Sequence, residues 1–158
     1  MSENENLIRR FEQGAASLEE ALRNVPESVL DRAPAPGKWT IRQLAAHLAD
    51  AELVIAGRLR WVAAEPGSPL KGFDQDKWAE GLGYTRQSPQ ESLDVFRALR
   101  RSTARLLRNL PDSAWQNTGK HEERGELTLR DLVEGSSGHA ERHIEQIRRV
   151  RNQFISAA

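Results

Sequence analysis

The chain has 158 residues, which is enough for about one domain with a substantial hydrophobic core. Its 23 Lys and Arg residues balance its 23 Asp and Glu residues, so no net charge draws it toward nucleic acid or a membrane surface. It has no cysteine, which excludes disulfides, thiolate metal ligands and a cysteine nucleophile, and which fits a reducing compartment.

The sequence predicts neither a signal peptide nor a membrane-spanning segment. Residues 1–6 are polar and acidic, unlike a signal peptide, and no apolar run approaches the length needed to span a bilayer. We therefore expect a cytoplasmic protein that binds neither membrane nor nucleic acid. The arginines between Arg97 and Arg108 and between Arg142 and Arg151 leave a basic nucleic-acid face as an alternative, although solvated helix faces explain them as well.

Four segments carry apolar residues at the three- and four-residue spacing of amphipathic helices. Each begins with Ser or Thr followed three residues later by an acidic or amide residue, the spacing of a capping box. The segments are residues 2–24, 40–62, 88–110 and 128–154. No stretch alternates as a strand would, so the sequence predicts an all-α fold, a four-helix bundle forming one domain over residues 1–158.

Two long connections join these helices. Residues 65–87 contain several prolines and glycines, yet Phe73 and Trp78 make the segment too aromatic for a spacer, so we expect a cover over one end of the bundle. The connection that ends at Leu127 contains Gly119 and Gly125 as expected turn residues. It also contains His121, which lies among charged residues and is expected to be exposed.

Histidines occupy positions on the inner faces of two predicted helices. His139 and His143 are one turn apart, so both side chains point the same way and can hold one divalent ion. His47, on the apolar stripe of the second helix, is the best candidate for a third ligand. A single histidine on an apolar face is usually a hydrogen-bonded core residue, but three such histidines favour a metal site between facing helices.

Three further residues are candidates for the pocket or for contacts with the ligands. Asp50 follows His47 by one turn and is a candidate to orient an imidazole N–H, although surface or capping roles fit equally well. Gln146 follows His143 by one turn and is expected to line the pocket or to bond a neighbouring helix. Trp78 is a candidate for contact with a substrate, the simpler interpretation being a packing residue.

These motifs together resemble a known family, the DinB-like superfamily, and within it most closely the YfiT-like branch that includes bacillithiol S-transferases. The resemblance covers roughly residues 11–150. It is carried by Trp39-Thr40-x-x-Gln43-Leu44-x-x-His47-Leu48-x-Asp50, by Phe73-Asp74 and Trp78, and by His139-x-x-x-His143-x-x-Gln146-Ile147.

The resemblance implies up-down-down-up connectivity of the bundle, and we expect a homodimer because members are often dimeric. It implies a divalent metal site at His47, His139 and His143, with zinc or nickel as the metal. Characterised members are mostly thiol-dependent transferases or isomerases, in which a low-molecular-weight thiol attacks an electrophilic small molecule. Many relatives have a further histidine where this chain has Arg142, a difference that bears on which anion the mouth of the site prefers.

The sequence thus favours a metal-dependent enzyme acting on a small molecule, either a thiol S-transferase or a hydrolase. The alternative is a non-catalytic stress or interaction protein whose metal is structural or adventitious. A closed, purely structural site would mainly contribute folding free energy, whereas an open site serves chemistry.

Overall fold

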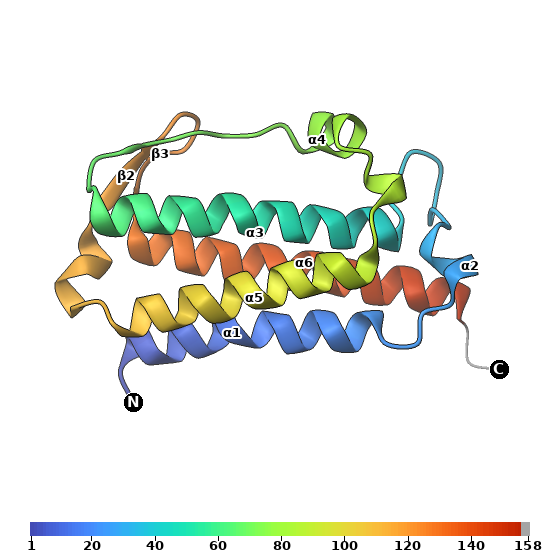
Figure 1. The fold of residues 1–158 in the computed structure, drawn as a ribbon, viewed down its shortest axis with the longest axis horizontal. Coiled ribbons are helices and arrows are strands. Elements are labelled where there is room, and N and C mark those ends of the chain that lie inside the picture. The colour runs from blue at the N-terminus through green and yellow to red at the C-terminus, as the bar shows by residue number, and fades with distance from the viewer. Residues whose placement is uncertain (156–158) are drawn as a thin grey trace.

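Four long helices form the predicted bundle in the computed structural model, which describes residues 1–155 (Figure 1). Each of them begins directly after the Ser or Thr expected to cap it, and the hydroxyl of that residue accepts the backbone N–H three residues later. The helices are α1 (Glu3–Leu22), α3 (Ile41–Ala64), α5 (Pro89–Arg108) and α6 (Leu129–Phe154). Within residues 1–155, none of the helices combines the length and the apolar character that crossing a membrane requires.

The helix directions confirm the up-down-down-up connectivity. In Figure 1, α1 and α6 run toward the end of the bundle where α2 (Glu27–Leu30) lies, and α3 and α5 run away from it. The neighbours α3 and α5 are therefore parallel, while α3 and α6 are antiparallel. A connection between parallel neighbours must return along the whole helix, roughly 36 Å for the 24 residues of α3 at about 1.5 Å per residue. This geometry explains the long segment of residues 65–88.

That returning segment is more regular than the sequence suggested. It contains the strand β1 (Pro69–Leu70), the helix α4 (Gln75–Gly81) and a 3₁₀ turn, η1 (Tyr84–Arg86). The side chain of Asp74 caps α4 by accepting two backbone N–H groups. The segment runs along the side of α3 rather than over one end of the bundle, which corrects the expected position of the cover (Figure 1).

The expectation that the chain has no strands is wrong. β2 (Thr118–His121) and β3 (Gly125–Thr128) form an antiparallel hairpin after the 3₁₀ turn η2 (Asp112–Gln116), and β1 pairs with β2 in parallel. Strands of two to four residues are too short to produce a recognisable alternation.

Two residues of this hairpin differ from expectation. Gly119 lies in β2 rather than in a turn, and a Cβ there would meet the side chains of Leu70 and Val62 at 2.8 Å. Gly125 begins β3 directly after the turn of residues 122–124, with a φ of 77° that favours glycine. His121 is buried rather than exposed, because the chain between α3 and α4 covers it through the pairing of β1 with β2.

The core of the described residues contains two large apolar clusters, one toward each end of the bundle, with a buried polar layer between them. A third, smaller cluster of Ala46, Ala79 and Tyr84 joins α3 to the returning segment. The polar layer contains Glu52 of α3, Arg100 of α5 and Ser136 of α6. The three- and four-residue spacing of apolar residues within residues 88–110 predicts Leu99 on the inner face, but Leu99 is only partly buried and the adjacent Arg100 is buried instead. The positions of α5 that face the core of the bundle recur every three or four residues, and Arg100 occupies one of them.

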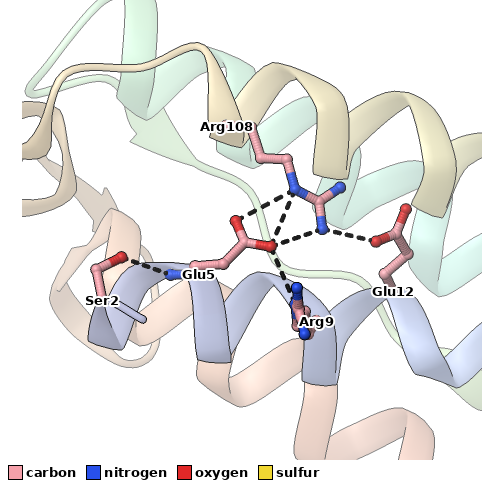
Figure 2. A network of polar contacts seen from close by, with 5 residues as sticks. All are labelled: Ser2, Glu5, Arg9, Glu12 and Arg108. Carbon is pink, nitrogen blue, oxygen red and sulfur yellow. Dashed lines mark hydrogen bonds and ion pairs between the residues drawn. The ribbon is translucent and has the colours of Figure 1, made fainter.

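Surface arginines are paired with glutamates of α1, which bears on the alternative of a basic face. Figure 2 shows Arg108 of α5 between Glu5 and Glu12, with nitrogen–oxygen distances of 3.1 and 2.8 Å. Ser2, in the same view, caps α1 through the backbone N–H of Glu5. Similar pairs join Arg97 to Glu19 and Arg148 to Glu20. These carboxylates offset the positive charge of the arginine-rich helices.

Candidate metal centre

The structure brings the three candidate ligands together. His47 comes from α3, and His139 and His143 come from one face of the antiparallel neighbour α6. One ring nitrogen from each histidine lies within 4.8 Å of the other two, and the Nε2 atoms of His47 and His139 are 3.0 Å apart. The ring planes are inclined to one another by 66° to 75°, so the rings do not stack face to face.

The donor set and its spacing fit a divalent ion. With metal–nitrogen bonds of about 2.0–2.1 Å and a tetrahedral arrangement, two imidazole nitrogens on one zinc lie roughly 3.3 Å apart. The distance between His47 and His139 is close to this value, and three imidazoles suit zinc, nickel, copper or iron. In the absence of an ion, the same contact is a hydrogen bond in which one ring donates its proton to the other.

The environment keeps the imidazoles neutral, as metal ligands must be. Burial, together with the positive charge that His143 would carry, lowers the pKa of His47 to about 4. Burial lowers the pKa of His139 to about 3, with the neighbouring histidines acting in the same direction. Burial also lowers the pKa of His143, although Gln146 opposes this shift. All three rings therefore present a lone pair at neutral pH.

Gln146 fixes the orientation of one candidate ligand. Its Oε1 lies 3.1 Å from Nδ1 of His143. An amide oxygen only accepts hydrogen bonds, so Nδ1 carries the proton and Nε2 keeps its lone pair for the cluster. In metal sites, a hydrogen bond of this kind fixes the tautomer and the orientation of the ligating histidine, and Gln146 is placed to do so for His143.

Asp50 is not brought to the imidazoles. Its carboxylate accepts a hydrogen bond from the hydroxyl of Tyr84 at 2.7 Å, and burial together with Asp50 raises the pKa of that hydroxyl. In residues 1–155, Nδ1 of His47 is buried without a hydrogen-bond partner. Asp50 therefore joins α3 to η1 of the returning segment, and the structure does not support an orienting contact with His47.

Trp78 approaches the histidines through Phe73. Its ring lies 4.7 Å from the ring of Phe73, which in turn lies 6.4 Å from that of His47. Trp39 also packs against His47, at 5.1 Å between ring centroids. The aromatic cover is consistent with the exposure of only 1% for His47, and Trp78 supports Phe73 rather than lining the pocket beside His139.

A pocket of about 390 Å³ opens beside His139. Its walls come from α3, from the returning segment at Phe73, from the tip of the β2–β3 hairpin and from α6. Arg58 and Arg124 line it, and the sequence analysis missed both. Arg58 had a detectable signal, because it is a charged residue that interrupts the apolar stripe of α3, whereas nothing in the local sequence distinguishes Arg124.

Comparisons with known proteins agree with this geometry. A family model described as the DinB superfamily matches residues 10–147. A "Putative metal-dependent hydrolase" from Oceanobacillus iheyensis is 32% identical over 119 residues, which cover 75% of this chain and 68% of the relative. The "Putative metal-dependent hydrolase YfiT" of Bacillus subtilis is 28% identical over 141 residues, covering 89% of this chain and 79% of the relative.

Two solved structures share the fold. YfiT from Bacillus subtilis, described as "a probable metal-dependent hydrolase with an unusual four-helix bundle topology", matches with a TM-score of 0.90 and 25% identity over 98% of this chain and 90% of its own. A mycothiol-dependent maleylpyruvate isomerase matches with a TM-score of 0.74 and 14% identity, covering 92% of this chain but 61% of the isomerase. The isomerase therefore shares the fold of this chain over only part of its own, longer chain.

Proposed function

The chain belongs to the DinB superfamily, and we propose that it is a divalent-metal-dependent enzyme that acts on a small molecule. One observation carries the proposal: His47, His139 and His143 converge beside a pocket of about 390 Å³ that His139 itself lines. A ligand in that pocket would lie next to the candidate metal centre. Zinc or nickel is the ion that we expect.

Three protein ligands leave a coordination position for chemistry, through which a bound divalent ion activates water, polarises a carbonyl group or holds a thiol. Other residues of the chain orient and shield the three histidines around this position. Gln146 accepts a hydrogen bond from Nδ1–H of His143, while Trp39 and Phe73 shield His47 from water. The neutral state of the rings leaves their lone pairs available for the ion.

We expect one of two reactions, hydrolysis or the transfer of a low-molecular-weight thiol to an electrophile. Hydrolysis is supported by the descriptions of the relatives from Oceanobacillus iheyensis and Bacillus subtilis. Thiol transfer is supported by the resemblance to the YfiT-like branch, and the chain has no cysteine of its own, so the sulfur nucleophile would come from a co-substrate. In both reactions a nucleophile meets an electrophilic carbon beside the three imidazoles.

The test is a screen of metal-free protein and of the same protein reloaded with zinc or nickel. One panel contains esters, amides and lactones in water, and a second combines small thiols with epoxides, alkyl halides and activated alkenes. We expect turnover in one panel that depends on the added metal, disappears in His143→Ala and persists in Glu145→Gln, an exposed change on the same helix.

The opposite outcome identifies a structural metal. If chelation lowers the thermal stability strongly while the reloaded protein turns over nothing in either panel, the enzyme proposal is contradicted. Closed sites contribute to folding in this way, whereas open ones serve chemistry.

A further inference from the structure

We infer that the pocket beside His139 binds the carboxylate of an anionic substrate through Arg58, Arg124 and Arg142. This inference rests on the proposed function and adds the chemical class of the substrate to it. Three guanidinium groups line the pocket, and Glu134 is the carboxylate among the lining residues. Glu134 faces Arg130, 3.8 Å away, so the pocket keeps an excess of positive charge.

The charge of Arg58 is buried and poorly compensated. Its side chain is 9% exposed, it donates one hydrogen bond to the carbonyl of Lys71, and its Nε is buried without a partner in residues 1–155. Within the same residues, no carboxylate oxygen lies within 4.0 Å of its guanidinium. Burial and the charge of Arg124 lower the pKa of Arg58, whereas Glu122 and Glu123 at the hairpin tip oppose this shift. A buried cation with an unsatisfied N–H is costly unless an anion joins it.

Arg124 adds a second positive charge from the tip of the β2–β3 hairpin. Nδ1 of His121 accepts the backbone N–H groups of Glu123 and Arg124, both at 3.2 Å, which fixes the backbone of the tip. The guanidinium of Arg124 then reaches toward α6, 4.0 Å from where a Cβ on Gly135 would lie. The buried His121 is not part of the metal cluster, and its two hydrogen bonds to the hairpin tip give it a structural role.

Arg142 brings a third positive charge to the side of the pocket nearest the histidines. It follows His139 by less than one turn of α6, and one guanidinium nitrogen is 3.3 Å from where a Cβ on Gly138 would lie. It lines both the pocket beside His139 and the neighbouring cleft beside His143. Among the described residues, neither Arg124 nor Arg142 has a carboxylate oxygen within 4.0 Å of its guanidinium.

The remaining walls define the rest of the ligand. Gly135 and Gly138 have no side chains, so the surface of α6 is open along the pocket between the arginines and His139. Ile55 and Leu132 contribute apolar surface to the same pocket. A substrate that fits has a carboxylate at one end, a short apolar stretch and a reactive centre that reaches the histidines. A planar carboxylate suits guanidinium groups because both of its oxygens accept hydrogen bonds in the same plane.

The test uses hexanoate and its neutral counterpart hexanamide as probes, with hexyl phosphate as a second anion. Dissociation constants are measured by ligand-detected NMR with zinc-loaded and with zinc-free protein. We expect hexanoate to bind at least about tenfold more tightly than hexanamide in both forms, because charge-assisted hydrogen bonds to arginine do not require the metal. Tighter binding of hexyl phosphate than of hexanoate would overturn the choice of carboxylate.

Exposed arginines provide the variants, so that folding is preserved. We expect Arg124→Gln and Arg142→Gln each to remove most of the preference for hexanoate. Arg149→Gln is the matched control, because Arg149 lines the cleft beside His143 but not the pocket beside His139.

Zinc content measured on the same samples separates the two proposals. A preference for hexanoate in protein that binds no zinc contradicts the proposed function alone. Zinc-binding protein that shows no preference, or a preference unchanged in both Arg124→Gln and Arg142→Gln, overturns the inference.

Discussion

Arg100 of α5 and Glu52 of α3 form an ion pair inside the bundle, with Nε of Arg100 2.9 Å from Oε2 of Glu52 and side chains that are 1% and 2% exposed. The same guanidinium donates hydrogen bonds to the carbonyl of Phe11 and to Ser136, so it touches all four long helices. Burial raises the pKa of Glu52, and the charge of Arg100 opposes this rise. Because Ser136 lies one turn before His139, the pair also fixes the part of α6 that leads to the histidines.

Removing one partner of this pair should destabilise the protein strongly. We expect Arg100→Met to lower the free energy of unfolding by about 3–5 kcal/mol, because it leaves Glu52 buried without its counter-charge. The double variant Glu52→Leu/Arg100→Met should recover much of this loss. Urea unfolding at neutral pH measures both values, with the partly exposed Arg97→Met as a control expected to cost no more than about 1 kcal/mol. An equally small loss for Arg100→Met would contradict this account of the layer.

Gly119 should not tolerate a side chain. We expect Gly119→Ala to lower the free energy of unfolding by about 1–3 kcal/mol, because the new methyl group would lie 2.8 Å from both Val62 and Leu70. Gly57→Ala on α3 is the control, since its methyl group would meet Trp61 at an ordinary 3.5 Å. Alanine is the better helix former by about 1 kcal/mol, so the control should be neutral or stabilising. If the two variants have the same stability in urea, the close packing of β2 on α3 is not as described.

Gln146 should tune metal affinity without being a ligand. Gln146→Leu removes the acceptor for Nδ1–H of His143, and we expect affinity for zinc to fall by about 10–100-fold. Gln146→Glu keeps an acceptor at the same place and should retain the affinity. Competition with a chromophoric chelator measures each constant, and Glu145→Gln serves as the neighbouring control. Unchanged affinity in Gln146→Leu would show that the hydrogen bond does not influence the site.

The stability of the metal-free protein should fall on mild acidification. Imidazoles of the unfolded chain titrate near a pKa of about 6.5, whereas His47 and His139 titrate at about 4 and about 3 in the folded protein. Between these values the unfolded chain binds more protons, so the free energy of unfolding decreases as the pH falls from about 7 to about 5.5. Most carboxylates contribute little in this window because their usual pKa values are lower. Glu52 is different, because burial raises its pKa, and its titration would oppose the slope set by the histidines.

Urea unfolding in the presence of a chelator measures this slope. His139→Gln should show a shallower dependence on pH, because one of the groups that resist protonation has been removed. A slope of the opposite sign, or the same slope in the variant, would contradict the buried neutral state of the ring.

Much of the helical framework follows from local sequence signals. Ser2, Thr40, Ser88 and Thr128 mark the starts of the four long helices because capping depends on residues only three positions apart. The convergence of the histidines could also be anticipated, since positions on inner faces of a bundle must meet. Zinc or nickel, the homodimer and the cytoplasmic location remain predictions.

The features that were missed depend on contacts between distant segments. β1 exists because residues 69–70 meet residues 120–121, and neither stretch is long enough to show a strand period on its own. Arg100 replaces the expected Leu99 in the core because Glu52, far away in the sequence, neutralises its charge. The spacing of Asp50 from His47 makes it a candidate to orient that imidazole, but its carboxylate accepts a hydrogen bond from Tyr84 of the returning segment instead. The arginine-lined pocket likewise needs four separate segments, which no local pattern reveals.

Metal content is the most direct test of the three-histidine centre. Untagged protein, purified and analysed for its elements before and after incubation with zinc or nickel, should contain about one ion per chain. His47→Ala should lose that ion, because it leaves two ligands from one turn of α6, while Glu145→Gln should keep it. An absence of bound metal in the unmodified protein after incubation, or full retention of the ion in His47→Ala, would contradict the three-histidine centre.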